Sequence, residues 1–538
     1  MSKERVFVFG IDGGTFDIIR PAVEAGRLPN LARLLEEGCH GPLRSTIPPL
    51  TPMAWTSFAT GVNAGRHGIY DFSRFEDGHL KLSTALDRRV PALWTHLTRS
   101  GRDAVVVNVP FTYPAEHIRG IMIPGFDTPK VEREVFWPHE VYDELIGRFG
   151  KYRFDWTFPI GQKFAPEEYL RDIEEVVAHR GETGRYLMQN HPWDFFMTVF
   201  TSTDHVQHVF WGLPDGREQV ERVYRAVDVE LGKFLEILPD DVNVVVMSDH
   251  GAGSIRKIFY LDNWLAREGY LTRPRSQMRR SLLKRAKSSA KRLLPVSMRK
   301  WLRARFPDLR NRVEGMIHEA TVDWAETRAF GIGMYGNIRI NLKGREPDGI
   351  VDPSEYDDLL AEISAKLMEL ADPDTGEKII ERVYRSDELY EGPNRDPAPD
   401  LVIHWRDYAY FTKKGVDQGD DIFGDYLNID SSEYPHSGTH RLDGVFIGRG
   451  PSFVEGVELE ADIRDLAPTL LYLLDEPLPE GLEGRVLEEA LSDELLRKRP
   501  PGEGQGGPGG SMEMDGEISL SEKEENAVRE RLKSLGYI

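Results

Sequence analysis

Aspartate and histidine residues recur in this sequence directly after segments that have the pattern of buried strands. They are Asp12 after VFVFGI, Asp249 and His250 after VNVVVMS, and Asp204 after FFMTVFTST, with His208 four positions later. Carboxylate oxygens and imidazole nitrogens are ligands that zinc and manganese accept in proteins. The spacing of four places Asp204 and His208 on the same side of a helical turn, where both can bind one ion. These residues predict a metal site.

Each of these residues also has a purely structural interpretation. An aspartate at the end of a strand most often caps the next helix or forms a turn. A single histidine is usually exposed or hydrogen-bonded in the core, which is our interpretation of His67, His205 and His436. The structural interpretation weakens because several ligand types recur at one edge of the predicted sheet. His440, in SGTHRLDG, would complete the set from far along the chain.

The strand-like segments alternate with helical ones through the first half of the chain. VFVFGI, DAVVVNVP, FFMTVF and VNVVVM are nearly continuous apolar runs, and LPNLARLLEEG has helical spacing. This alternation predicts an α/β protein with a mostly parallel sheet covered on both faces. Ligands of such sheets bind at the carboxyl ends of the strands, where the aspartates lie.

The composition indicates a globular protein. The chain has 538 residues, of which 40% are hydrophobic and 29% are charged, and this excludes a mostly disordered or disulfide-stapled protein. The net charge of -21 argues against a nucleic-acid binder, so we expect no specific nucleic acid partner. The single Cys39 cannot form an internal disulfide. The start MSKERVFVFG lacks the apolar region of a signal peptide, so we expect a cytoplasmic protein.

One segment has the opposite charge. Residues 273–305 contain 13 Lys and Arg and no Asp or Glu, with apolar residues interspersed at roughly helical spacing. This basic amphipathic segment has three interpretations: a solvated surface insertion, a peripheral contact with an anionic membrane at its inner surface, or a lid over an anionic substrate.

Five motifs appear in an order that resembles a known family. They are GIDGGTFD, TPMAWTSFATGVNAGRHGIYDF, TSTDHVQH, MSDHG, and GTHRLDGVFIGRGP followed by DLAPTLL. Together they resemble the alkaline phosphatase superfamily, and within it the type I phosphodiesterase/nucleotide pyrophosphatase family. The resemblance spans nearly the whole chain. It implies an alkaline-phosphatase-like three-layer αβα sandwich with a largely parallel central sheet and an inserted subdomain.

The resemblance also implies a site with two divalent metal ions, for which zinc is the first expectation and manganese the second. One ion would be held by Asp204, His208 and His440. The other would be held by Asp12, Asp249, His250 and the nucleophile.

Matching SFATG to the family pattern SxxTG places that nucleophile at Thr51. A threonine hydroxyl is a poor nucleophile until a metal lowers its pKa or a base takes its proton. Thr51 opens a helix-like run, and the first N–H groups of a helix can bind phosphate oxygens. An N-cap role is compatible with this one, and Thr46, Thr56 and Thr60 are the competing candidates.

The sequence departs from the family at one substrate contact. Where the phosphodiesterase branch places an asparagine that binds a phosphoryl oxygen, this chain has Phe72. The donor is therefore missing or comes from another residue, with Arg66 and Arg74 as candidates, and the preference for diesters over monoesters is left open. Cys39 is not in a sulfatase C-x-P-x-R pattern, so a formylglycine sulfatase is not expected.

The resemblance implies a metal-dependent hydrolase of phosphodiester or pyrophosphate bonds that forms a phosphothreonine intermediate. Its partner would be a phosphate-ester small molecule of nucleotide or nucleotide-sugar type, or a lipid head group. The alternatives on the same scaffold are a phosphotransferase or phosphomutase and a phosphomonoesterase. A degenerate binding protein is a third hypothesis, although the complete ligand set argues against it.

The same reasoning divides the chain into six parts. They are the first part of the catalytic core at 1–270, the basic insertion at 271–312, an inserted α+β region at 313–430, the final part of the core at 431–498, a Gly/Pro linker at 499–518 and a C-terminal helix at 519–538. The helix opens with a capping box, Ser521 with Glu524, and has Val528, Leu532 and Leu535 on one face.

Overall fold

The computed structural model describes residues 4–76, 79–156, 164–274, 322–413, 420–426, 436–501 and 520–535. The basic segment 273–305 lies outside these ranges apart from its first two residues, and so does nearly all of the predicted linker. Within the described ranges, no helix combines the length and the apolar character needed to cross a bilayer.

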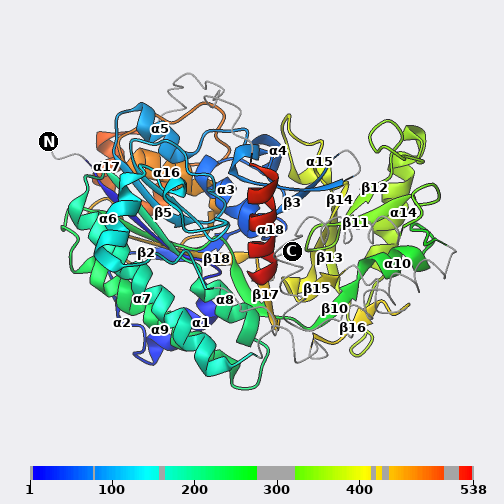
Figure 1. The fold of residues 1–538 in the computed structure, drawn as a ribbon, viewed down its shortest axis with the longest axis horizontal. Coiled ribbons are helices and arrows are strands. Elements are labelled where there is room, and N and C mark those ends of the chain that lie inside the picture. Colours follow the sequence, from blue (N-terminus) through cyan, green and yellow to red (C-terminus); the bar gives the residue numbers. More distant parts are fainter. Residues whose placement is uncertain are drawn as a thin grey trace.

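A twisted eight-stranded sheet forms the centre of the larger lobe (Figure 1). In spatial order its strands are β19 (Ala461–Asp462), β2 (Cys39–Arg44), β18 (Asp443–Arg449), β8 (Asn243–Met247), β1 (Val6–Ile11), β7 (Phe195–Phe200), β5 (Ala104–Val109) and β6 (Gly120–Pro124). Pairs among the last five strands, and the pair of β19 with β2, are parallel, whereas β18 runs antiparallel to both of its neighbours.

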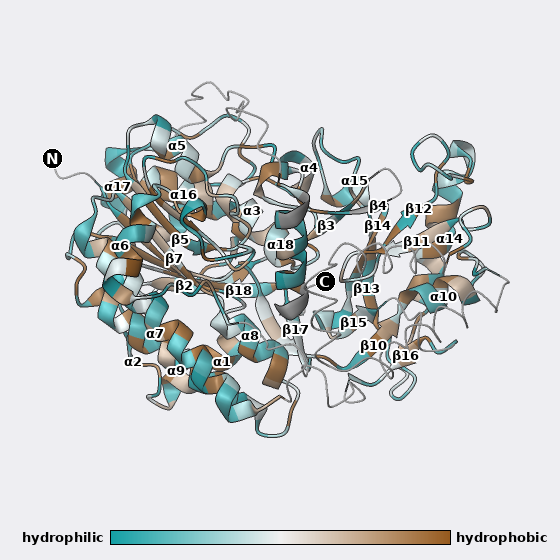
Figure 2. Ribbon diagram, in the orientation of Figure 1, coloured by the Kyte–Doolittle hydropathy of each residue, from teal (hydrophilic) through white to brown (hydrophobic). Residues whose placement is uncertain are grey.

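Helices cover both faces of this sheet, and its central strands β1, β5, β7 and β8 are mostly apolar (Figure 2). Side chains alternate between two cores, so that Phe7 and Phe9 face one layer while Val6 and Val8 face the other. The first layer contains α1 (Phe16–Glu24), α2 (Pro29–Glu36), α6 (Glu140–Phe149), α7 (Pro166–Asn190), α8 (Ser202–Phe210), α9 (Gly216–Leu235) and α18 (Glu522–Leu535). The second contains α3 (Thr51–Thr60), α5 (Leu93–Arg99), α16 (Leu466–Leu473) and α17 (Asp493–Lys498). This arrangement confirms the predicted αβα sandwich with a largely parallel central sheet.

A smaller lobe has its own apolar core, on the right of Figure 1. Its sheets are β11 (Ala329–Ile332), β12 (Asn337–Ile340), β14 (Leu401–Trp405) and β13 (Ile380–Arg385) in that order, and β15 (Tyr410–Lys413), β10 (Lys257–Tyr260) and β16 (Phe423–Gly424). Its helices are α10 (Leu261–Arg267), α14 (Tyr356–Met368) and α15 (Ser386–Leu389). The structure also contains two short pairs of strands. They are β3 (Ser73–Glu76) with β4 (His79–Leu82), and β9 (Gly251–Ser254) with β17 (Gly438–Arg441). Helix α4 covers Ala64–His67.

Candidate active site

The seven residues predicted to form the site are all buried at one edge of the central sheet. Asp12 directly follows β1, Asp249 and His250 follow β8, Asp204 and His208 lie on α8 after β7, Thr51 begins α3, and His440 lies on β17. His440 reaches the site because β17 pairs antiparallel with β9, which continues from His250. The sheet edge and one hairpin-like pair therefore bring together residues from both ends of the chain.

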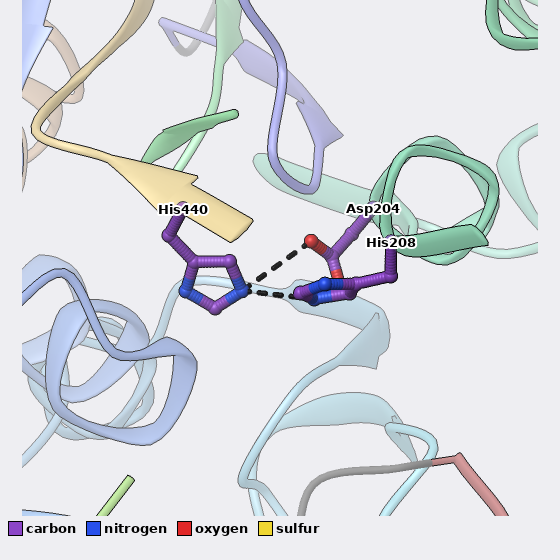
Figure 3. Close-up of side chains that lie close together, drawn as sticks. All are labelled: Asp204, His208 and His440. Carbon is purple, nitrogen blue, oxygen red and sulfur yellow. Dashed lines mark hydrogen bonds and ion pairs between the residues drawn. The ribbon is translucent and has the colours of Figure 1, made fainter. Parts of the chain in front are cut away.

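Asp204, His208 and His440 form the first ligand group, and their ligand atoms lie within 4.8 Å of one another (Figure 3). His208 Nε2 is 3.3 Å from Asp204 Oδ2, and His440 Nε2 is 3.5 Å from Asp204 Oδ1. The two Nε2 atoms are 3.1 Å apart. The spacing of four residues on α8 thus places Asp204 and His208 on the same side of the helix, as the sequence predicts.

Asp12, Asp204 and His250 form a second group within the same limit. His250 Nε2 lies 3.8 Å from Asp12 Oδ1 and 3.1 Å from Asp249 Oδ2. The two groups share Asp204, whose carboxylate therefore lies close to the ligands of both.

Backbone carbonyls contact the Nδ1 atom of each candidate ligand histidine and leave its Nε2 atom facing the other candidate ligands. The Nδ1 atom of His208 contacts Gly438 O at 3.0 Å, that of His250 contacts Gly251 O at 3.0 Å, and that of His440 contacts Pro49 O at 2.6 Å. Since a carbonyl only accepts, each Nδ1 carries a proton, so the neutral form of each ring would have its Nε2 lone pair available for a ligand. The lone pairs of His208 and His440 would face each other unless a cation lay between them. This second contact on Nδ1 is the usual way in which proteins orient metal-binding histidines.

The carboxylates also fit a cation. Burial, with the neighbouring charges of Asp249 and Asp204, raises the pKa of Asp12 well above its usual value. Burial likewise raises the pKa of Asp249 to about 6. Asp12 Oδ1 and Asp249 Oδ2 are buried and accept no hydrogen bond from the described part of the chain. A buried carboxylate oxygen that lacks a hydrogen-bond donor is stabilised by a neighbouring positive charge, which a divalent cation would supply.

Thr51 is the threonine whose hydroxyl lies among these ligands. Its Oγ1 is 3.2 Å from His250 Nε2, and the side chain is 1% exposed. The competing hydroxyls are bonded to backbone carbonyls: Thr46 to Pro48, Thr56 to Pro52 and Thr60 to Thr56. Because Thr51 is the first residue of α3, the N–H groups of the first turn have no partner within the helix and can bind an anion there.

Residues that the sequence reasoning did not select support this geometry. Trp55 Nε1, one turn into α3, donates to Asp12 Oδ2 at 3.2 Å and so links the nucleophile helix to a ligand. Gln207 Nε2 donates to Gly13 O at 2.9 Å. Gly13 has a φ of 65°, and a Cβ atom there would lie 3.1 Å from Asp204 Oδ1. The glycines of GIDGG were visible in the sequence, whereas no pattern indicated Trp55.

The three histidines given a structural interpretation have different surroundings. His67 Nδ1 accepts from the Ile69 N–H at 3.1 Å, so its Nε2 donates to Ser57 Oγ at 3.0 Å. His205 lies 3.6 Å from the carboxylate of Asp155. The ring of His436 lies 4.8 Å from that of His208, next to the first ligand group, and sequence reasoning missed this position.

The residues considered for phosphate binding have contacts elsewhere. Phe72 is 1% exposed and packs against Phe126 in the core. Arg66 Nη1 donates to Gly481 O at 2.6 Å, and Arg74 Nη1 donates to Leu82 O at 2.7 Å and pairs with Asp87 at 2.8 Å. These contacts give no support to a phosphate-binding role for the three residues.

A cation that binds this site should stabilise the fold. A ligand specific for the folded state at 100 times its Kd adds about 2.7 kcal/mol to the free energy of unfolding. We therefore expect the Tm of chelator-treated protein to rise by several degrees with zinc or manganese, measured by differential scanning fluorimetry. Potassium at equal ionic strength is the control, and an unchanged Tm with either divalent ion would contradict a preformed metal site.

The profile of the family described as type I phosphodiesterase / nucleotide pyrophosphatase matches residues 6–443. The chain belongs to this family. Two solved structures of murine ectonucleotide pyrophosphatase / phosphodiesterase 5, one of them an inactive threonine-to-alanine variant in complex with AMP, share 14% sequence identity with it. Each alignment covers 91% of this chain and 100% of the murine chain, with TM-scores of 0.45 and 0.46.

Membership of the type I phosphodiesterase/nucleotide pyrophosphatase family makes the chain a phosphodiester hydrolase. The family generally uses two divalent metal ions, and the matched range includes both Asp/His groups described above.

Proposed function

We propose that this enzyme cleaves phosphodiester or pyrophosphate bonds at a two-metal site, with Thr51 as the nucleophile. The observation that carries the proposal is the position of Thr51 Oγ1 among buried carboxylates and histidine Nε2 atoms, 3.2 Å from that of His250. One ion would be held by Asp204, His208 and His440. The other would be held by Asp12, Asp249, His250 and Thr51. Asp204, which belongs to both ligand groups, would contact this ion as well.

Divalent ions at these positions would supply Lewis-acid stabilisation of phosphate oxygens and a lowered pKa for bound hydroxyl groups and water. The chain supplies the rest. In the first step the Thr51 oxygen forms a bond to phosphorus and loses its proton, while the bond to the leaving group breaks and that group departs as an alcohol or phosphate. In the second step water cleaves the threonine phosphoester and restores the hydroxyl.

The first turn of α3 would orient the phosphate during both steps. Backbone N–H groups at a helix N-terminus bind anions through hydrogen bonds and the helix dipole. Pro52 contributes no N–H, so the donors available are those of Thr51 and Met53. This backbone source is compatible with the apolar Phe72, because it requires no asparagine side chain.

The substrate class that we propose is a small phosphate ester of nucleotide, nucleotide-sugar or lipid head-group type. The family supports a substrate in which the phosphorus carries an organic leaving group.

A membrane contact through 273–305 is a separate proposal. Sedimentation with anionic vesicles at low salt tests the membrane contact, and absence of binding would contradict it.

The test of the function is an assay on matched bis-(nitrophenyl) and mono-nitrophenyl phosphate, with chelator, zinc or manganese. We expect metal-dependent cleavage of the diester in preference to the monoester. Preferential monoester cleavage would instead indicate a phosphomonoesterase. Transfer of the phosphoryl group to an added alcohol without net hydrolysis would indicate a phosphotransferase.

A further inference from the structure

The C-terminal helix α18 brings an arginine into contact with Phe126. Val528 and Leu532 of α18 are 2% and 1% exposed and belong to the apolar core of the larger lobe. Arg531, on the turn between them, is partly buried and donates from Nε to Phe126 O at 3.2 Å. In Figure 1 this helix crosses the centre of the view in red. A segment distant in sequence from the motifs therefore contributes a cation to the interior.

The carbonyl that accepts this bond belongs to Phe126, whose ring lies 6.2 Å from that of His205. His205 is part of a buried polar cluster centred on Asp155. The Asp155 side chain is completely buried, and its Oδ2 is 3.6 Å from Arg180 Nη2 and 3.6 Å from His205 Nε2. Thr201 Oγ1 donates to the same oxygen. Arg180 Nη1 in turn donates to Val199 O at 2.8 Å and to Thr201 Oγ1 at 2.9 Å. The cluster is continuous from α7 through the end of β7 to the start of α8.

Its members lie on either side of Asp204. Thr201 directly precedes α8, and His205 follows Asp204 in the first turn of that helix. Neighbouring helical residues point in different directions, so Asp204 contacts the ligand histidines while His205 contacts Asp155. The polar cluster thus contacts the first turn of α8 on a different side from the candidate ligand group.

Arg531 contributes to the charge balance of this cluster. Against the effect of burial, His205, Arg180 and Arg531 hold the pKa of Asp155 below its usual value. Burial lowers the pKa of Arg531, and Asp155 acts against that change. A buried carboxylate keeps its position only when its charge and hydrogen bonds are satisfied.

We propose that Arg531 is a positioning residue for the metal site. It helps to hold Asp155, which in turn holds Thr201 and His205, and these fix the turn that carries Asp204. The inference rests on the metal site of the proposed function and adds the C-terminal helix to the parts of the chain on which that site depends.

The expected effect follows from the distance between Arg531 and the ligands. Replacing a residue that hydrogen-bonds to a metal ligand typically lowers metal affinity or activity by about 10–100-fold. Arg531 does not contact a candidate ligand itself in this proposal, but acts on Asp204 through Asp155 and His205. We therefore expect a loss of roughly tenfold in metal affinity and in kcat, with KM for the diester little changed.

The experiment compares full-length Arg531→Met, Arg531→Lys and Arg529→Met. Arg529 lies on the same helix and pairs with Glu525 at 3.3 Å, so it is a matched control of the same residue type. Manganese affinity is measured by titration calorimetry, kcat and KM with bis-(nitrophenyl) phosphate, and folding by Tm. The lysine variant should lose less than the methionine variant, because the ammonium keeps the charge, and it serves as the test if the methionine variant does not fold.

Wild-type manganese affinity and kcat in folded Arg531→Met would overturn the proposal, and so would an equal loss in Arg529→Met. If the wild-type chain binds manganese without cleaving the diester, the proposed function fails, but the comparison of affinities still decides the role of Arg531. If the wild-type chain binds neither manganese nor zinc, the positioning role falls together with the metal site.

Discussion

Thr51→Ala is expected to lower kcat for metal-dependent diester cleavage by roughly 10⁴-fold or more, the scale on which removal of a nucleophile acts in well-studied hydrolases. The physical reason is that the Thr51 Oγ1 is the hydroxyl that lies 3.2 Å from His250 Nε2, inside the ligand cluster. Thr51→Ser keeps a hydroxyl at this position and should retain a substantial part of the activity. The measurements are kcat and trapping of labelled substrate on the protein.

Thr60→Ala is the matched control for this prediction. It removes a buried threonine hydroxyl from the same helix, but one that is bonded to Thr56 O at 2.7 Å. We expect near wild-type kcat from folded Thr60→Ala. Labelled product covalently attached to Thr51→Ala, or turnover by that variant at the wild-type rate, would show that the nucleophile is another group.

Asp204→Asn is expected to abolish detectable activity and to weaken the binding of both ions. Asp204 belongs to both ligand groups, so one substitution removes an anionic ligand from each. Replacement of residues that only orient ligands already costs about 10–100-fold, so loss of a shared ligand should cost at least ~10²-fold in metal affinity. Metal content after dialysis and calorimetric titration measure this effect.

The control for Asp204→Asn is Asp143→Asn. Asp143 is an exposed carboxylate whose side chain is 57% accessible and pairs with Arg133 at 2.8 Å. Exposed ion pairs contribute about 0–1 kcal/mol, so its loss should leave metal content and kcat unchanged. Two ions bound with wild-type affinity in Asp204→Asn would exclude the shared-ligand arrangement.

Much of the larger lobe could be predicted from the sequence, because buried parallel strands leave a clear pattern of continuous apolar residues. VFVFGI forms β1 and VNVVVM contains β8, and both strands end within two residues of an aspartate. The direction of β18 could not be predicted. GVFIGR is equally apolar in a parallel or an antiparallel strand, and only its pairing with β2 and β8 determines the direction.

The candidate ligands could be proposed from residue type and position, but their orientation could not. The sequence places histidines near strand ends, yet it does not show that Pro49 O and Gly438 O hold the Nδ1 atoms of His440 and His208. Those contacts join residues far apart in the chain and depend on tertiary packing. The same is true of Trp55 and Arg531, whose residue types alone indicate no link to the site.

The hydrogen bond between Pro49 O and His440 Nδ1 joins residues 391 positions apart. A chain emerging from the ribosome therefore carries Asp12, Thr51, Asp204 and His250 long before β17 exists. At that stage an ion at the first proposed position would lack its third ligand, because His440 has not yet been added to the chain. Stable metal loading thus belongs after synthesis of β17, and a nascent chain arrested before that strand should not retain the first ion.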